Sequence, residues 1–202
     1  MYDPIFDARY SISDSNAVSN PRWYFAEPIW TTAQRQGLIV APIYWVSAEV
    51  PFGGLLPNYW LYFNDSTPLA DRVNYTLTLL AKKEERPSFL TIYMSVVDTI
   101  GHAYGPDNET EITMALQQVD ESIGALLKGL EEMEMKDKVN IVLTSDHGMA
   151  ETSQDRAILL DQYIAMSSVN VITCMAVFLS FNSHSLFFLG EKRLSNRLFE
   201  SC

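Results

Sequence analysis

Cysteine is scarce in this chain of 202 residues, which holds only Cys174 and Cys202. Two late cysteines support neither a disulfide framework nor a thiolate zinc site. Basic residues are also few, since 14 Lys and Arg stand against 25 Asp and Glu and leave a formal net charge of −11. No basic stripe offsets that charge, so duplex nucleic acid is excluded as a partner and divalent cations are favoured.

Long apolar runs are missing as well. None reaches the roughly 18 residues of a membrane-spanning helix, and the longest candidate, residues 169–181, has a length that suits a core strand. The amino-terminal sequence MYDPIFD lacks the basic and then apolar layout of a signal peptide. Three glycosylation sequons, at Asn64, Asn74 and Asn108, weakly favour the secretory route.

What the chain does contain is enough apolar sequence, 48% of its residues, to bury the core of one α/β domain. Prolines, glycines and an Asn–Glu capping pair mark the ends of alternating elements. Residues 1–27 and 46–67 read as irregular. We expect helices over residues 28–36, 68–80 and 108–133 and strands over residues 38–45, 89–97, 139–146 and 169–181. This order predicts a mostly parallel sheet flanked by helices.

The third of these helices carries an apolar stripe at helical spacing, which we interpret as core packing without chemistry. Its members are Ile112, Leu116, Val119, Ile123, Leu126, Leu127, Leu130 and Met133.

Two of the expected strands run directly into an acid and a histidine. Asp146 and His147 follow one run, and Asp98 follows another, with His102 four residues later in what we expect to be a turn closed by Gly101. The carboxyl ends of parallel strands meet at one sheet edge, so the four side chains are expected to lie together. Carboxylate and imidazole ligands suit zinc or manganese at a catalytic site. One such pair alone is more often a solvated loop or a capped turn; two pairs make the interpretations about equal.

The remaining candidates are weaker. His184, the third histidine, reads as an exposed loop residue. Ser145 and His147 do not read as a nucleophile and its base, because such close neighbours rarely attain triad geometry and no Gly-x-Ser-x-Gly elbow is present.

Eight segments together suggest a relationship. In order they are MYDP, EPIWTTAQRQG, the Trp45 segment, STPLADR, VDTIGHAYGPD, ALQQVD, NIVLTSDHGM and SQDRAILLDQYI. With them the chain resembles the ectonucleotide pyrophosphatase/phosphodiesterase family, type I phosphodiesterases of the alkaline phosphatase superfamily. The resemblance implies that residues 1–165 are the central part of an alkaline-phosphatase-like catalytic domain, incomplete here. Residues 166–202 match poorly, and either continue the domain or are a gene-model artefact.

The same resemblance implies the site and its chemistry. Asp98 and His102 match ligands of one zinc ion, and Asp146 and His147 match ligands of a second. Trp45, Phe63 and Tyr93 match aromatics around a bound nucleotide, with Phe63 and Tyr93 stacking on its base; without the resemblance, such aromatics are more often core. The implied reaction is hydrolysis of nucleotide phosphodiester or pyrophosphate bonds through a covalent phospho-threonine, at two metals about 4 Å apart.

Several parts of the family pattern have no match. These are the nucleophilic threonine, one metal-binding aspartate and one histidine, so no catalytic residue is assigned and we expect the isolated chain to be an inactive fragment. Trp45-Val-Ser-Ala-Glu49 replaces the family's Trp-Pro-Gly-Ser/Thr-Asp, and Ser95-Val-Val97 replaces Glu-Glu-Pro. The alternatives are a phosphodiesterase of lipid or choline phosphodiesters, or a pseudoenzyme. The expected location is extracellular or at the cell surface, and the expected partner is a small-molecule phosphodiester.

Overall fold

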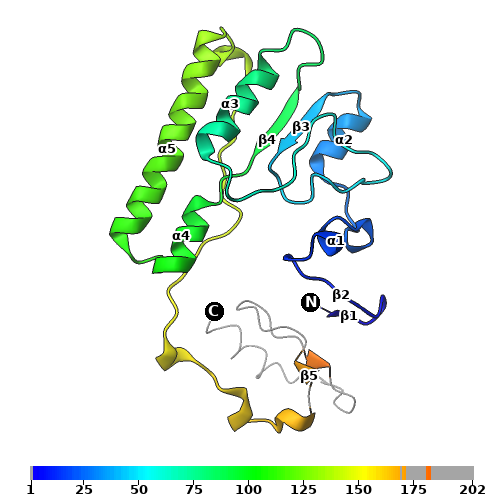
Figure 1. Ribbon diagram of the computed structural model, residues 1–202, viewed down its shortest axis with the longest axis vertical. Coiled ribbons are helices and arrows are strands. Elements are labelled where there is room, and N and C mark those ends of the chain that lie inside the picture. Colours follow the sequence, from blue (N-terminus) through cyan, green and yellow to red (C-terminus); the bar gives the residue numbers. More distant parts are fainter. Residues whose placement is uncertain (1, 169, 172–180, 183–202) are drawn as a thin grey trace. The chain divides into compact units, whose positions relative to one another are not determined.

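A pair of parallel strands lies at the centre of the unit formed by residues 18–149 (Figure 1). Strand β3 (Val40–Ile43) pairs with β4 (Phe89–Ile92), and Val40 lies opposite Phe89. The computed structural model describes residues 2–168, 170–171 and 181–182. Every residue of β3 is buried, as expected for an apolar strand covered on both faces. The predicted α/β class is confirmed.

Helices cover the two faces of β3. Because side chains alternate along a strand, Val40 points to one face and packs with Trp30 of helix α2 (Ile29–Arg35). Ala41 and Ile43 point to the other face, where they pack with Leu79 of helix α3. Helix α3 (Leu69–Leu80) therefore forms the third layer of a helix–sheet–helix arrangement.

Pro42 is tolerated inside β3 because its backbone nitrogen and carbonyl point away from β4. Val40 receives a hydrogen bond from the Tyr59 amide on its carbonyl, at 3.1 Å, and donates its own amide to Asn58 Oδ1 at 3.0 Å. Both backbone groups of Val40 thus bond to the loop that contains Asn58 and Tyr59, and neither bonds to β4. Pro42, two residues on, points the same way, so its missing N–H costs no inter-strand bond.

The predicted helix boundaries at proline and glycine are confirmed. Pro28 and Pro68 lie at the N-caps of α2 and α3. Gly37 follows the end of α2 with a φ of 83°, a left-handed conformation that glycine adopts without steric cost.

Helix α5 (Glu109–Glu132) begins as predicted, with Asn108 Oδ1 accepting a hydrogen bond from the Glu111 amide at 3.2 Å. It packs against α3 and α4 (Figure 1). Its buried positions include two small residues, Ala115 and Ser122. Small side chains let neighbouring helices approach closely.

The apolar stripe predicted on α5 is only partly core. Leu130 is 1% exposed and packs with Leu80 of α3, whereas Leu116 and Leu127 are 52% and 39% exposed. The prediction of uniform core packing is therefore wrong for these two leucines. The stripe is wider than the face that α3 and α4 cover.

The strand predicted over residues 139–146 is not formed. Within the described residues this run pairs with no strand, and Ile141, Val142 and Leu143 are 49%, 86% and 75% exposed. An extended run needs inter-strand hydrogen bonds to become a strand, so an apolar sequence alone does not suffice. Only its first residue, Val139, packs against the cluster that contains Leu130.

The second unit comprises residues 1–17 and the described part of 150–202. Its elements are short: strand β1 (Tyr2–Asp3) pairs antiparallel with β2 (Ala8–Arg9), and β5 (Asn170–Val171) pairs antiparallel with β6 (Phe181–Asn182). Helix α1 (Ser15–Val18) spans the boundary between the units. The single 3-10 turns of this second unit are η3 (Gln154–Arg156), η4 (Leu160–Gln162) and η5 (Met166–Ser168), while η1 (Pro21–Trp23) and η2 (Lys136–Lys138) lie in the unit of residues 18–149.

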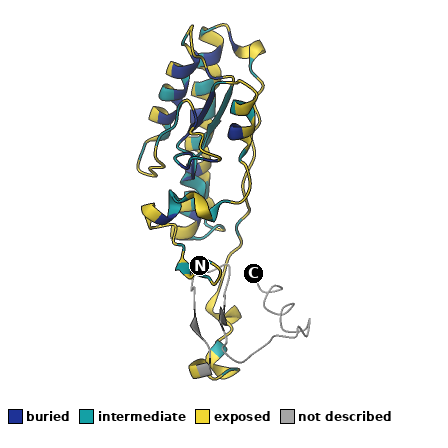
Figure 2. Cartoon of the chain, turned by 90° about the vertical axis from the view of Figure 1, so that its right-hand side faces the viewer, coloured by how far each residue is buried: buried dark blue, intermediate teal, exposed yellow. Residues whose placement is uncertain are grey.

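The predicted strand over residues 169–181 falls mostly outside the described residues, as do His184 and both cysteines. Buried residues gather in the strands and helices of the unit of residues 18–149 (Figure 2). No helix in the described ranges combines the length and the apolar character that a bilayer crossing needs.

Candidate metal centre and aromatic site

Asp98 and His102 lie on helix α4 (Val96–Tyr104), so the predicted turn is wrong, and β4 ends earlier than predicted. A spacing of four residues places both side chains on one face of a helix, with His102 Nε2 3.5 Å from Asp98 Oδ1. Asp98 lies in the first turn of α4, where the helix dipole stabilises its negative charge.

The second pair lies beside the first. His147 Nε2 is 3.9 Å from Asp98 Oδ1 and 3.8 Å from Asp146 Oδ2. The structure therefore brings together the four side chains that the sequence singled out, with Asp98 between the two imidazoles. It does so although the run before Asp146 is not a strand.

Gly101 brings the two pairs into contact, rather than closing a turn. A Cβ at Gly101 would lie 2.5 Å from the Sδ atom of Met149 and 3.2 Å from its Cε atom. Met149 thus rests directly on α4, two residues after His147. Glycine is the residue that leaves room for this contact.

The donor atoms of the four side chains are of the types that bind a divalent metal. Asp98 Oδ1 is buried and has no hydrogen-bond partner among the described residues. The Nδ1 atom of His147 lies 3.0 Å from the Gly148 carbonyl oxygen, and a proton there would leave Nε2 free as a ligand. That carbonyl, together with the charge of Asp146, raises the pKa of His147. Within the described ranges, the structure groups no three His, Cys, Asp or Glu side chains closely enough to hold an ion.

Tyr93, just after β4, is the centre of the predicted aromatic site. Its ring meets those of Trp45 and Phe63 edge to face, at centroid distances of 5.8 Å in both cases. Its hydroxyl donates to Asp146 Oδ2 at 3.2 Å, so the aromatic site adjoins the carboxylate–imidazole pairs. Burial raises the pKa of Tyr93, and the charge of Asp146 raises it further.

Phe63 is the exposed member of the aromatic site. Phe63 and Tyr93 are inclined by 65° and contact each other, so they do not form a parallel slot. Phe63 is 38% exposed, so part of its side chain remains accessible.

In each of the two segments that depart from the family pattern, one serine makes a hydrogen bond to another part of the chain. Ser47 has a φ of 67° and donates its hydroxyl to the Tyr24 hydroxyl at 2.8 Å. Ser95 donates its hydroxyl to Asp65 Oδ1, one turn before Asp98 on α4. Ser95 thus links the loop after Phe63 to the helix of the first acid–histidine pair.

Sequence reasoning missed one residue of this region, Arg72. Its side chain is 1% exposed, beneath Phe63 and Tyr93. The available signal was an arginine on the buried face of an amphipathic helix, within the STPLADR segment.

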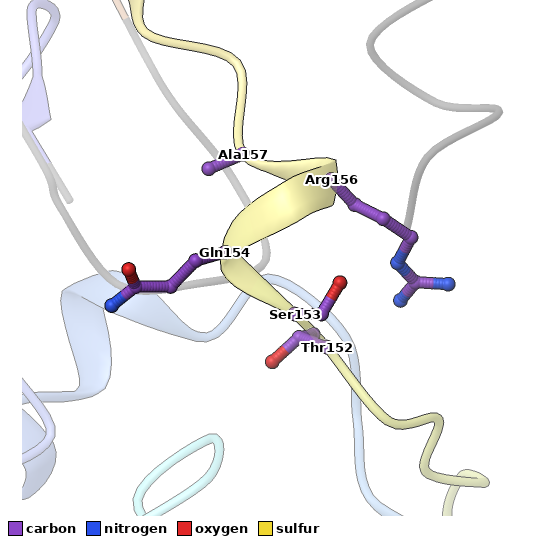
Figure 3. Close-up of a pocket in the computed structure, with 5 residues that line it drawn as sticks. All are labelled: Thr152, Ser153, Gln154, Arg156 and Ala157. Atoms are coloured by element: carbon purple, nitrogen blue, oxygen red, sulfur yellow. The ribbon is translucent and has the colours of Figure 1, made fainter.

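A hollow of about 410 Å³ lies in the other unit, along the turn η3 (Figure 3). Its lining residues are Thr152, Ser153, Gln154, Arg156 and Ala157, and Figure 3 shows their side chains leaving the turn in different directions. None of the predicted metal-site or aromatic-site residues lines it, although Ser153, Gln154, Arg156 and Ala157 belong to the SQDRAILLDQYI segment.

A family model described as type I phosphodiesterase / nucleotide pyrophosphatase matches residues 1–186. Human ectonucleotide pyrophosphatase/phosphodiesterase family member 1 is 38% identical over 174 residues, 85% of this chain and 19% of that protein. Venom phosphodiesterase 2 of Crotalus adamanteus is 40% identical over 164 residues, 81% of this chain and 20% of that protein. The chain thus spans about a fifth of the length of these curated relatives.

Solved structures of similar fold are longer as well. An inactive form of murine ectonucleotide pyrophosphatase / phosphodiesterase 5, in complex with AMP, superposes with a TM-score of 0.83 at 28% identity, over 93% of this chain and 50% of that one. The human counterpart superposes with a TM-score of 0.82 at 26% identity, over 100% of this chain and 51% of that one.

Proposed function

The chain belongs to the type I phosphodiesterase / nucleotide pyrophosphatase family, and we propose that it is the central part of a two-zinc hydrolase. The proposed substrates are nucleotides with a phosphodiester or pyrophosphate bond. The observation that carries the proposal is the convergence of two acid–histidine pairs on the buried, unpartnered Oδ1 atom of Asp98.

In this proposal Asp98 and His102 hold one zinc ion, and Asp146 and His147 hold the other. Bound zinc supplies Lewis acidity toward a phosphoryl group. The carbonyl of Gly148 orients the ring of His147, and α4 fixes the spacing of Asp98 and His102. We also propose that the reaction passes through a phospho-threonine, to which no threonine of this chain is assigned.

Three aromatic side chains are proposed to hold the nucleotide. The exposed ring of Phe63 receives the base, Tyr93 supports the ring of Phe63 edge-on, and Trp45 in turn supports the ring of Tyr93. AMP in the murine relative's structure supports a nucleotide as the ligand class. Choline phosphodiesters are the alternative, because aromatic rings also bind quaternary ammonium groups.

An extracellular or cell-surface location is proposed as well. The names of the relatives, ectonucleotide pyrophosphatase and venom phosphodiesterase, support it. Asn64 and Asn74 are exposed and Asn108 is half-buried, so the sequon side chains reach the surface. Glycosylation at these three residues remains a proposal.

The test is an assay of the full-length gene product, secreted by cultured cells, with the nitrophenyl esters of thymidine monophosphate and of phosphocholine. We expect activity in the medium, faster turnover of the nucleotide ester, loss of activity with a chelator and its return with zinc. Asp98→Asn should lower kcat/KM about a hundredfold or more, because it removes a charged ligand. Asp120→Asn, an exposed change on α5, is the control.

The outcomes separate the alternatives. Activity that survives metal removal contradicts the two-zinc proposal, and faster turnover of the choline ester reassigns the substrate. A metal-loaded protein that turns over neither ester is a pseudoenzyme. Activity confined to the cell lysate contradicts the proposed location.

A further inference from the structure

Arg72 lies inside the protein, although arginine is rarely buried without a paired carboxylate. Its side chain is 1% exposed, and the part of the chain that the structure describes places no carboxylate within ion-pair distance of it. We propose that Arg72 is a positioning residue for base recognition: its guanidinium fixes Phe63 and Tyr93 without touching the ligand. The inference rests on the proposed nucleotide site.

The guanidinium joins two segments that are distant in sequence. Its Nη1 atom donates to the carbonyl of Tyr93 at 2.7 Å. Its Nη2 atom donates to the carbonyl of Asn64 at 2.9 Å and, at 3.3 Å, to that of Asp65, while Nε donates to Thr67 at 3.1 Å. Arg72 therefore ties the loop after Phe63 to the end of β4.

The same group supports the aromatic ring itself. The Cζ atom of Arg72 lies 6.0 Å from the centroid of Phe63 and 5.1 Å from that of Tyr44. Hence the backbone beside Phe63, the backbone of Tyr93 and the ring of Phe63 all contact one charged group. A displacement of this guanidinium changes the position of both rings together.

Lysine is a poor replacement at this position. Arginine presents five N–H donors in a rigid planar fork, whereas the lysine ammonium has three donors at one point. An ammonium therefore cannot reach carbonyls on both sides of the fork. Arg72→Lys keeps the positive charge but loses the planar fork of donors, so it tests the positioning of the two rings rather than the effect of the charge.

The experiment measures binding of AMP and of ribose 5-phosphate to the full-length protein by titration calorimetry. Stacking accounts for the difference between these ligands, so Arg72→Lys should raise the Kd of AMP about tenfold and leave that of ribose 5-phosphate within about twofold. In a Phe63→Leu background, Arg72→Lys should add less than about twofold, because its target ring is gone. Arg86→Lys, at an exposed arginine, is the matched control.

Several outcomes overturn the inference. Equal weakening of AMP and ribose 5-phosphate assigns Arg72 a purely structural role, and unchanged AMP binding removes any role. Full additivity with Phe63→Leu shows that Arg72 does not act through that ring. Arg72→Gln, which keeps donors without charge, gives the same readout if the lysine variant does not fold. Selective loss of AMP binding in a protein without turnover supports the inference while contradicting the proposed reaction.

Discussion

Gly101 lies at the contact between helix α4, which carries Asp98 and His102, and the segment that carries Asp146 and His147. The thioether of Met149 occupies the space that a side chain at position 101 would need. Alanine there gains helix propensity of about 1 kcal/mol, so the fold is expected to tolerate it. The side chain of Met149 must move aside, however, and we predict that His147, two residues before it, shifts away from Asp98.

We predict that Gly101→Ala lowers the zinc affinity of the full-length protein about tenfold, with little change in its Tm. Zinc titration and thermal melting measure the two effects. Met149→Ala in the same chain vacates the space and should restore most of the affinity. Wild-type affinity in the single variant contradicts the role given to Gly101.

The grouping of the four acid and histidine side chains is predictable from the sequence, whereas their role as metal ligands stays a prediction. Asp98, His102, Asp146 and His147 were marked by spacing and by resemblance, and the structure brings them together. Arg72 was not predictable, because no local pattern distinguishes a guanidinium that binds distant carbonyls from one that faces water. Its role depends on tertiary contacts alone.

At the scale of elements, α5 offers a matched pair of glycines. Gly124 has open space around its Cα, whereas a Cβ at Gly129 would lie 2.4 Å from Cδ1 and 3.1 Å from Cγ of Leu77. Both lie within one helix, so alanine improves helix propensity equally at each. The difference between the two substitutions is therefore the packing against α3.

We predict that Gly124→Ala raises the free energy of unfolding by about 0.5–1 kcal/mol, while Gly129→Ala lowers it by about 1 kcal/mol through overpacking. Urea unfolding followed by circular dichroism measures both values. A gain at position 129 equal to that at 124 shows that α5 does not approach α3 as closely as described.

Two elements differ from their sequence-based predictions for opposite reasons. Residues 96–104 contain β-branched residues and a glycine, which disfavour a helix, yet α4 forms and packs against α5. Residues 139–146 have the composition of a buried strand, yet in the described structure they lack the neighbour that a strand requires. Local sequence specifies neither a packing partner nor a pairing partner. Helices bounded by proline, glycine and Asn108 were predictable because their signals are local.

At the scale of the whole molecule, the run Ile141–Leu143 combines high exposure with an uncharged, apolar sequence. Such a run favours pairing between chains. The net charge of −11 opposes association by mutual repulsion. Self-association of the 202-residue chain should therefore increase with salt, which screens the charge.

We predict that Val142→Lys reduces this self-association in sedimentation velocity runs at several concentrations. Val142 is 86% exposed, so the change should leave the helical circular dichroism intact. The added positive charge alone favours association, because it moves the net charge toward zero. Gln117→Lys makes the same charge change on α5, and an equal effect there contradicts a special role for the apolar run.

Tyr93 contacts both the aromatic site and the carboxylate–imidazole pairs. Its ring packs against Trp45 and Phe63, and its hydroxyl donates a hydrogen bond to the carboxylate of Asp146. A ligand at the aromatic site that orders the Tyr93 side chain should therefore strengthen binding at the acid–histidine pairs. Linkage requires the reverse effect to be equal in free energy. If both proposed sites bind their ligands, we expect base recognition and ion binding to be thermodynamically coupled through the phenol of Tyr93.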